Sequence, residues 1–284
     1  MLTRRTVLAM ALARPRLPVS AITDEIAHTE AEAFAFCRQY GLRAIELRNV
    51  PGSKRGYWDL PATGQKNFAS ECKEQGVKVS FIDSGLLAAP LPGTVPEKPP
   101  GAAEWGRYGR RMEDLKRVLE LAHAVNCEQV RCFAFRRVAV PRAIYQQIAD
   151  AIGPMVEMAA KARVRLLLEN EASCNVNTCR EMAEFAKLIP SEWFGLNWDP
   201  GNAVRFETAF PDGYALLPKR RILNVQVKGK GILPNGPEKV DWKSTLQALR
   251  RDGYEGHIGL ETHTGNRQAD SHGAIRALLQ LTAT

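Results

Sequence analysis

Four short segments end in side chains that can hold a metal ion and move protons. In VRLLLENEASCN, Glu169 follows an apolar run. The strand predicted within FGLNWDPGN leads to Asp199, and the strand within IGLETH leads to Glu261. The fourth segment, LNVQVKGKG, carries Gln226 and Lys228. If the four segments are neighbouring parallel strands, their carboxyl ends meet at one edge, where α/β folds place their chemistry.

Carboxylates gathered at such an edge predict a cation and proton transfer. Three of them repel one another strongly unless a cation neutralises them. Oxygen ligands favour Mn²⁺, Mg²⁺ or a similar hard ion over zinc, and such an ion polarises a carbonyl. Glu169 and Glu261, on opposite sides of a substrate, can remove and return a proton beside that carbonyl. Lys228, on the same strand face as Gln226, can stabilise the developing oxyanion.

Further polar residues follow strands at the same edge. Glu171 lies on the same strand face as Glu169 and is the alternative to it; we prefer Glu169 because it directly follows the apolar run. For Glu46 and Arg48, a structural ion pair is the alternative to substrate binding. For His263, the alternative is a loop histidine whose hydrogen bonds are satisfied within the protein. The predicted substrate-binding residues are Glu46, Arg48, Asn202 and His263.

One order of elements recurs along the chain: a helical pattern, then a glycine or other helix breaker, then a short apolar strand. Strands that alternate with helices in this way predict a parallel sheet. Eight such units in 284 residues favour a single (β/α)8 TIM barrel over residues 19–284. A doubly wound sheet is disfavoured because neither GxGxxG nor GxxxxGK[ST] occurs. The predicted strands are Val19–Ile22, Ala44–Leu47, Val77–Ile82, Gln129–Phe133, Arg165–Leu168, Phe194–Asn197, Leu223–Val227 and Ile258–Leu260.

The composition excludes some classes of protein. The formal charge is +8, from 39 Lys+Arg against 31 Asp+Glu, but four of the arginines lie in the first sixteen residues. No basic stripe interleaved with aromatic residues occurs, so we expect no nucleic-acid partner. The six cysteines form no CxxC pair, which predicts buried free thiols rather than a zinc site.

Two segments lie outside this pattern. Residues 1–18 contain Arg4-Arg5 and a short apolar run, so they fit either a twin-arginine signal for export to the periplasm or a basic, disordered tail of a cytoplasmic protein. No apolar stretch reaches the roughly 18 residues that span a bilayer, so no membrane association is expected. Ser84–Gly101, rich in proline and glycine, is either a lid over the barrel mouth or a passive surface loop.

The sequence resembles the xylose-isomerase-like TIM-barrel superfamily of sugar isomerases and epimerases, which also contains inosose dehydratases and apurinic-site endonucleases. TDEI, ELR, LLLEN, NWDPGNA, VQVK and GYEGHIGLE stand in the order of that superfamily from Thr23 onward. The resemblance implies one divalent metal, with Mn²⁺ preferred and Mg²⁺ or Co²⁺ as alternatives, and an acid/base pair of Glu169 and Glu261. Relatives are often dimers or tetramers, so a homo-oligomer fits the resemblance. The implied metal ligands are Glu169, Asp199, Gln226 and Glu261.

The chain departs from the commonest pattern of that superfamily at two positions. Many members carry histidine where Gln226 and Asn202 stand, and a glutamine carbonyl is a weaker ligand than imidazole. The predicted function is therefore a metal-dependent isomerase or epimerase acting on a sugar or polyol. A lyase or dehydratase acting on a keto-sugar or inosose shares the same first step. A non-catalytic sugar-binding barrel is a third hypothesis, and a nuclease is disfavoured because only five histidines occur.

Overall fold

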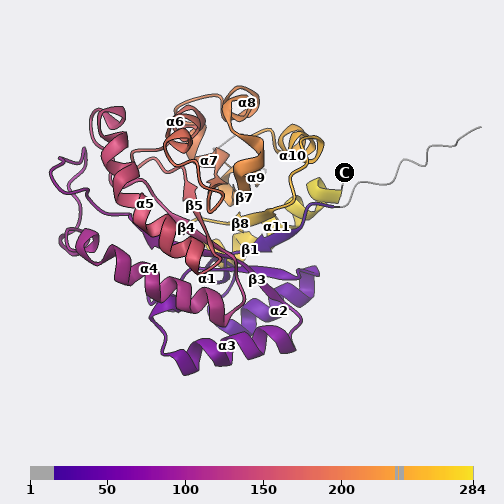
Figure 1. Cartoon of the computed structure of the whole chain (residues 1–284). Helices are drawn as coiled ribbons and strands as arrows, with labels where there is room; N and C mark the ends of the chain where they lie inside the picture. The colour runs from indigo at the N-terminus through magenta and orange to yellow at the C-terminus, as the bar shows by residue number, and fades with distance from the viewer. Residues whose placement is uncertain (1–15, 234–235, 237–239, 284) are drawn as a thin grey trace, which may run out of the picture.

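Eight parallel strands form one sheet in the order β1-β8-β7-β6-β5-β4-β3-β2, and helices surround it (Figure 1). A parallel bridge between Ile22 and Glu46 links the end of β1 to β2 and brings the two edges of the sheet together. The predicted (β/α)8 TIM barrel is confirmed. The computed structural model describes residues 16–233, 236 and 240–283, so nearly all of the predicted signal or tail over residues 1–18 lies outside it.

All eight predicted segments are strands, with small differences at their ends. The largest difference is at β3, which runs four residues beyond its predicted end. The strands are β1 Val19–Ala21, β2 Ala44–Leu47, β3 Lys78–Leu86, β4 Gln129–Cys132, β5 Arg165–Glu169, β6 Phe194–Trp198, β7 Ile222–Lys228 and β8 His257–Glu261.

The helices begin and end close to their sequence signals. Thr178 and Glu181 form the predicted capping box at the start of α6. At α2 the Thr29 hydroxyl accepts from the N–H of Glu32, but the Glu32 carboxylate accepts from His28, so that box is incomplete. The α-helices are α1 Thr23–Ile26, α2 Glu30–Tyr40, α3 Ala62–Glu74, α4 Arg107–Ala124, α5 Tyr145–Lys161, α6 Cys179–Phe185, α7 Pro200–Ala203, α8 Tyr214–Leu216, α9 Gly229–Ile232, α10 Trp242–Arg251 and α11 Arg267–Ala283.

The core lies between the sheet and its ring of helices. Leu166–Leu168 of β5 are almost completely buried, as expected for a central strand covered on both faces. Trp198 is fully buried and donates its indole N–H to the sulfur of Cys179 at 3.2 Å, so it packs rather than faces a ligand. All six cysteines are free and buried, which confirms that prediction. Among the described helices, none combines the length and the apolar composition needed to cross a membrane.

The segment that was predicted as either a lid or a passive surface loop begins later than expected. Ser84 belongs to β3, because strand pairing with β4 extends as far as Leu86. Beyond the strand, the backbone N–H of Glu97 donates to the carbonyl of Arg137 at 2.8 Å, so this segment is tied to the loop that follows β4.

Candidate active site

Nine charged side chains are buried in the described chain, and hydrogen bonds and ion pairs connect them at the carboxyl ends of the strands. Seven are carboxylates and two are cations, and the nearly buried Arg48 adds a third cation. Such burial is tolerated only where the charges are paired and hydrogen-bonded. The nine residues are Asp24, Glu25, Glu46, Asp83, Glu169, Asp199, Glu261, Arg131 and Lys228.

Three of these carboxylates can act together on one cation. Oxygen atoms of Glu169, Asp199 and Glu261 all lie within 4.8 Å of one another. Glu169 ends β5, Asp199 follows β6, and Glu261 ends β8, so the parallel register carries all three to the same mouth. Lys228, at the end of the intervening strand β7, places its Nζ 2.9 Å from Asp199 Oδ2 and 2.8 Å from Glu261 Oε2.

Gln226 lies two residues before Lys228 on β7, deeper in the barrel. Its Nε2 donates to Glu46 Oε2 at 2.7 Å and to Asp83 Oδ1 at 3.2 Å. Its Oε1 is buried and accepts no hydrogen bond from the described residues. An unpaired buried acceptor is costly, so this oxygen is available to a ligand.

Arg131 pairs with carboxylates of the cluster on β3 and β5. Its Nη1 lies 3.0 Å from Glu169 Oε2 and 3.3 Å from Asp83 Oδ1. The same guanidinium donates to the backbone carbonyls of Asp83 and Ser84. With three partners on two strands, it fixes Glu169 in one orientation.

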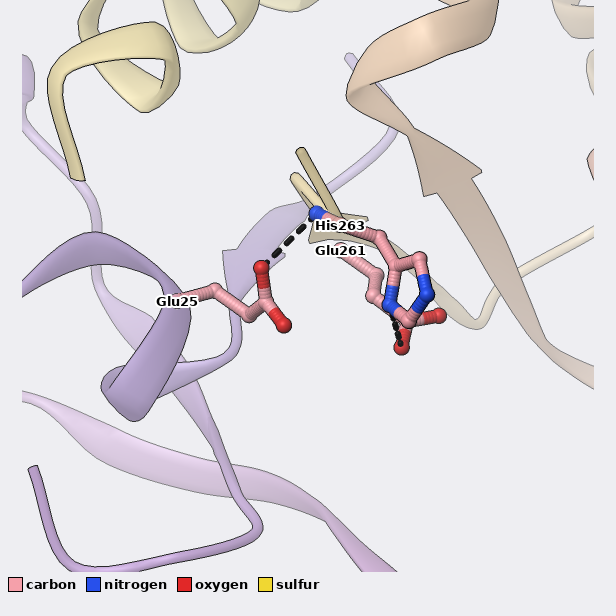
Figure 2. Close-up of side chains that lie close together, drawn as sticks. All are labelled: Glu25, Glu261 and His263. Atoms are coloured by element: carbon pink, nitrogen blue, oxygen red, sulfur yellow. Dashed lines mark hydrogen bonds and ion pairs between the residues drawn. The ribbon is translucent and has the colours of Figure 1, made fainter. Parts of the chain in front are cut away.

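A second acidic group lies at the rim, where α1 meets the end of β8 (Figure 2). The backbone N–H of His263 donates to Glu25 Oε2 at 2.7 Å, and its Nδ1 lies 3.5 Å from Glu261 Oε1. The guanidinium of Arg48 pairs with Asp24, Glu25 and Glu261. His263 is more than half exposed, so it is the most accessible polar group on Glu261.

The surroundings push the pKa values of the cluster apart. Burial raises the pKa of Glu169 to about 7, although Arg131 opposes the shift. Burial also raises the pKa of Asp199 to about 6, against the effect of Lys228. Burial alone would raise the pKa of Glu261, but Lys228, His263 and Arg48 outweigh it and hold that pKa well below its usual range. Carboxyl groups separated in this way can serve as acid and base.

Most of the residues selected from the sequence come together. Glu169, Asp199, Lys228 and Glu261 share the mouth, together with Arg48 and His263 at its rim. Gln226 lies deeper and contacts Glu46 and Asp83. Asn202 lies at the edge of the cluster, with its Nδ2 3.5 Å from Glu169 Oε1 and 2.8 Å from the carbonyl of Asn170. Glu46 lies deeper, fully buried, and accepts from Ser20 at 2.6 Å. Glu171 is outside the cluster and accepts from the N–H of Ser173 at 3.1 Å.

Four residues of the cluster were not selected from the sequence: Asp24, Glu25, Asp83 and Arg131. Asp83 directly follows the predicted strand Val77–Ile82, so it carries the same strand-end signal as Glu169. Arg131 stands between the apolar residues Val130 and Cys132 of a strand, where an unpaired charge would be costly, and that points to a buried partner.

An eight-stranded parallel barrel with its buried charges at the carboxyl ends of the strands has the place and form of a TIM-barrel active site. The chain matches the family described as xylose isomerase-like TIM barrel over residues 34–283. It belongs to that family. A search among curated proteins finds no match.

Solved structures share the fold at low identity. An L-ribulose 3-epimerase is 18% identical, with a TM-score of 0.68 and 94% of each chain covered. A probable 3-DHS dehydratase from Bacillus anthracis is 14% identical, with a TM-score of 0.72, covering 93% of this chain and 99% of that one. A xylose isomerase-like TIM barrel protein from Mycobacterium smegmatis in complex with magnesium is 16% identical, with a TM-score of 0.68, covering 94% and 97%. At these identities the neighbours show the shared fold.

Proposed function

We propose that the chain is a metal-dependent sugar isomerase or epimerase that transfers a proton next to a carbonyl. The clustering of Glu169, Asp199 and Glu261 carries this proposal, because their oxygens lie within 4.8 Å of one another at the mouth of the barrel. The unpartnered Oε1 of Gln226 is the fourth oxygen ligand of the proposed site. The set suits a hard divalent ion, with Mn²⁺ preferred and Mg²⁺ or Co²⁺ as alternatives.

When bound, such an ion supplies a Lewis acid that makes the C–H bond beside a carbonyl more acidic. We assign the removal of that proton to Glu261, whose contacts with Lys228 and Arg48 keep it ionised. The electron pair moves to the carbonyl oxygen, where Lys228 can donate a hydrogen bond. Glu169, in its protonated form, donates a proton to the resulting anion. Donation to the opposite face of the same carbon inverts that carbon. Donation to the former carbonyl carbon moves the carbonyl, and the proton of the neighbouring hydroxyl then passes to the original carbonyl oxygen.

We assign the substrate to the sugars or polyols, because the structural neighbours include an L-ribulose 3-epimerase. Asn202 and His263, beside Glu169 and Glu261, are the proposed hydroxyl contacts, together with Arg48 at the rim. Glu46 accepts hydrogen bonds from Ser20, Gln226 and Asn224, so in our proposal it acts on substrate only through Gln226. The similarity to a probable 3-DHS dehydratase favours a second candidate, in which the same proton removal is followed by loss of a β-hydroxyl as water.

Exchange of the substrate C–H proton with solvent tests this proposal. The Mn²⁺-loaded protein is incubated in D₂O with a panel of ketoses and keto-sugars, and deuterium incorporation is followed by NMR. Glu261→Gln should lower the exchange rate by a factor of about 10²–10⁴. Glu171→Gln, which changes the same side chain outside the cluster, is the control and should retain it.

Undiminished exchange in Glu261→Gln would refute the assigned base. Dehydrated products in place of sugar isomers would select the dehydratase. Sugar binding that survives metal removal, with no exchange in the presence of metal, would select a non-catalytic binding barrel.

A further inference from the structure

A cavity beside the mouth has the opposite charge to the candidate active site. It has a volume of about 290 Å³ and lies between the β2–α3 connection, the end of β3 and the first half of α4. Four arginines and two aspartates line it, a formal excess of two positive charges. The six residues are Asp59, Arg107, Arg110, Arg111, Asp114 and Arg117.

The two aspartates share one arginine as their ion-pair partner, so these three side chains together carry one net negative charge. Arg117 places its Nη1 2.7 Å from Asp59 Oδ1 and its Nη2 2.5 Å from Asp114 Oδ1. The positive charge that faces the cavity therefore comes from Arg107, Arg110 and Arg111, for which the described chain shows no carboxylate within ion-pair distance.

Two arginine side chains of the wall each carry an unpartnered donor. Arg111 stacks over the ring of Tyr108 at 4.2 Å and donates its Nη1 to the Tyr108 carbonyl at 3.1 Å, which fixes its guanidinium. Its Nε is nevertheless buried without a hydrogen-bond partner, and the same is true of Arg117 Nε. Among the unpartnered buried side-chain atoms of the described residues, these two are the only arginine nitrogens, and both belong to this cavity.

The cavity opens next to the candidate active site. Arg107 Nη1 lies 3.8 Å from where a Cβ on Gly85 would be, and Gly85 is two residues past Asp83 on β3. Ser84, between them, lines the cavity, and its carbonyl accepts from Arg131, the residue that holds Glu169. One strand end thus separates an arginine-lined cavity from a cluster rich in carboxylates.

We infer that this cavity is an anion-binding site that takes a single phosphate or carboxylate group. Arginine guanidinium groups recognise such oxyanions with paired, charge-assisted hydrogen bonds. The small volume fits one such group rather than a polymer. The inference rests on the lining of the cavity and stands whether or not the proposed reaction is correct.

Calorimetric titration with inorganic phosphate, without added metal, tests the site. We expect one phosphate to bind per native chain. The double variant Arg107→Met/Arg110→Met should bind phosphate with an affinity about 100-fold lower, about tenfold for each arginine lost. Both side chains are exposed, so their replacement leaves the core intact. The control is Lys73→Met/Lys116→Met, which removes two exposed charges from α3 and α4 outside the cavity and should bind phosphate as the native chain does.

Phosphate affinity that is equal in the native chain and the arginine variant would overturn the inference, as would no binding to the native chain at about 10 mM phosphate. Glu169→Ala should retain phosphate binding, which separates this site from the proposed metal site. Titration with acetate and with a sugar monophosphate identifies the source of the anion. Tighter binding of the sugar monophosphate than of phosphate would make the group part of a substrate that reaches the mouth, and equal binding would make it a free anion.

Discussion

Replacing Lys228 by methionine tests whether this ammonium holds the carboxylates together. Its Nζ lies 2.9 Å from Asp199 Oδ2 and 2.8 Å from Glu261 Oε2. At these distances each contact provides about 6 kcal/mol of Coulomb attraction for an effective dielectric constant of about 20, most of which offsets the cost of burying the charges. Removal of one partner from a buried pair costs about 3–5 kcal/mol in measured cases. We expect the metal-free Lys228→Met protein to lose about that much free energy of unfolding.

A divalent ion should reverse this loss. In the native chain an ion must compete with Lys228 for Asp199 and Glu261, whereas in the variant the carboxylates are unopposed. Urea unfolding in EDTA and in Mn²⁺ measures both effects, because a ligand that binds only the folded state stabilises it. Mn²⁺ should stabilise Lys228→Met more than the native protein.

Lys187→Met, which removes an exposed lysine from the far end of the β5–β6 connection, is the control and should change stability by less than about 0.5 kcal/mol. Equal stabilities of native and Lys228→Met protein in EDTA, or equal gains in Mn²⁺, would refute the reasoning.

Two further predictions concern pH and packing. Burial, with Lys78 as a smaller cause, lowers the pKa of His257 from 6.5 to about 4. The folded state then binds fewer protons than the unfolded state between these values, so this histidine costs up to about 3 kcal/mol as the pH falls through them. Urea unfolding at pH 7.5 and pH 4.5 should show a smaller acid loss in His257→Gln, and an identical loss would contradict the sign. A Cβ on Gly259 would lie 2.2 Å from Glu46 Oε1, so Gly259→Ala should lose about 1–3 kcal/mol by overpacking. Gly109→Ala in α4, where nothing lies within 4 Å, should gain about 0.5–1 kcal/mol, and similar thermal shifts in the two variants would contradict the packing argument.

The barrel and the main carboxylates could be predicted because their signals are local. Glu169 and Glu261 each end a strand that the apolar pattern reveals, and adjacent parallel strands bring their carboxyl ends together whatever the side-chain rotamers are. The same argument predicted that Lys228 and Gln226 lie on one strand face, since residues two apart share a face. The structure places Lys228 at the mouth and Gln226 deeper, against Glu46 and Asp83.

The partners of these residues depend on register and rotamers, which no local pattern specifies. The pairing of β3 with β4 shifts register between Ile82 and Leu86, and that shift lies beside the contact between Asp83 and Arg131. The amide of Gln226 turns its nitrogen to Glu46, a residue 180 positions away in the chain. The sequence therefore predicted that the strand-end carboxylates meet beside Lys228, whereas the pairing of Arg131 with Glu169 and Asp83 became apparent only in three dimensions.

Direct titration with Mn²⁺ tests the central proposal, that the strand-end carboxylates form a metal site. Free Mn²⁺ is followed by electron paramagnetic resonance in the native chain, in Glu169→Gln/Glu261→Gln and in the control Glu171→Gln. We predict about one ion per native and control chain and its loss in the double variant, whose fold is checked by circular dichroism. No ion on the native chain, or equal binding by a folded double variant, would contradict the account.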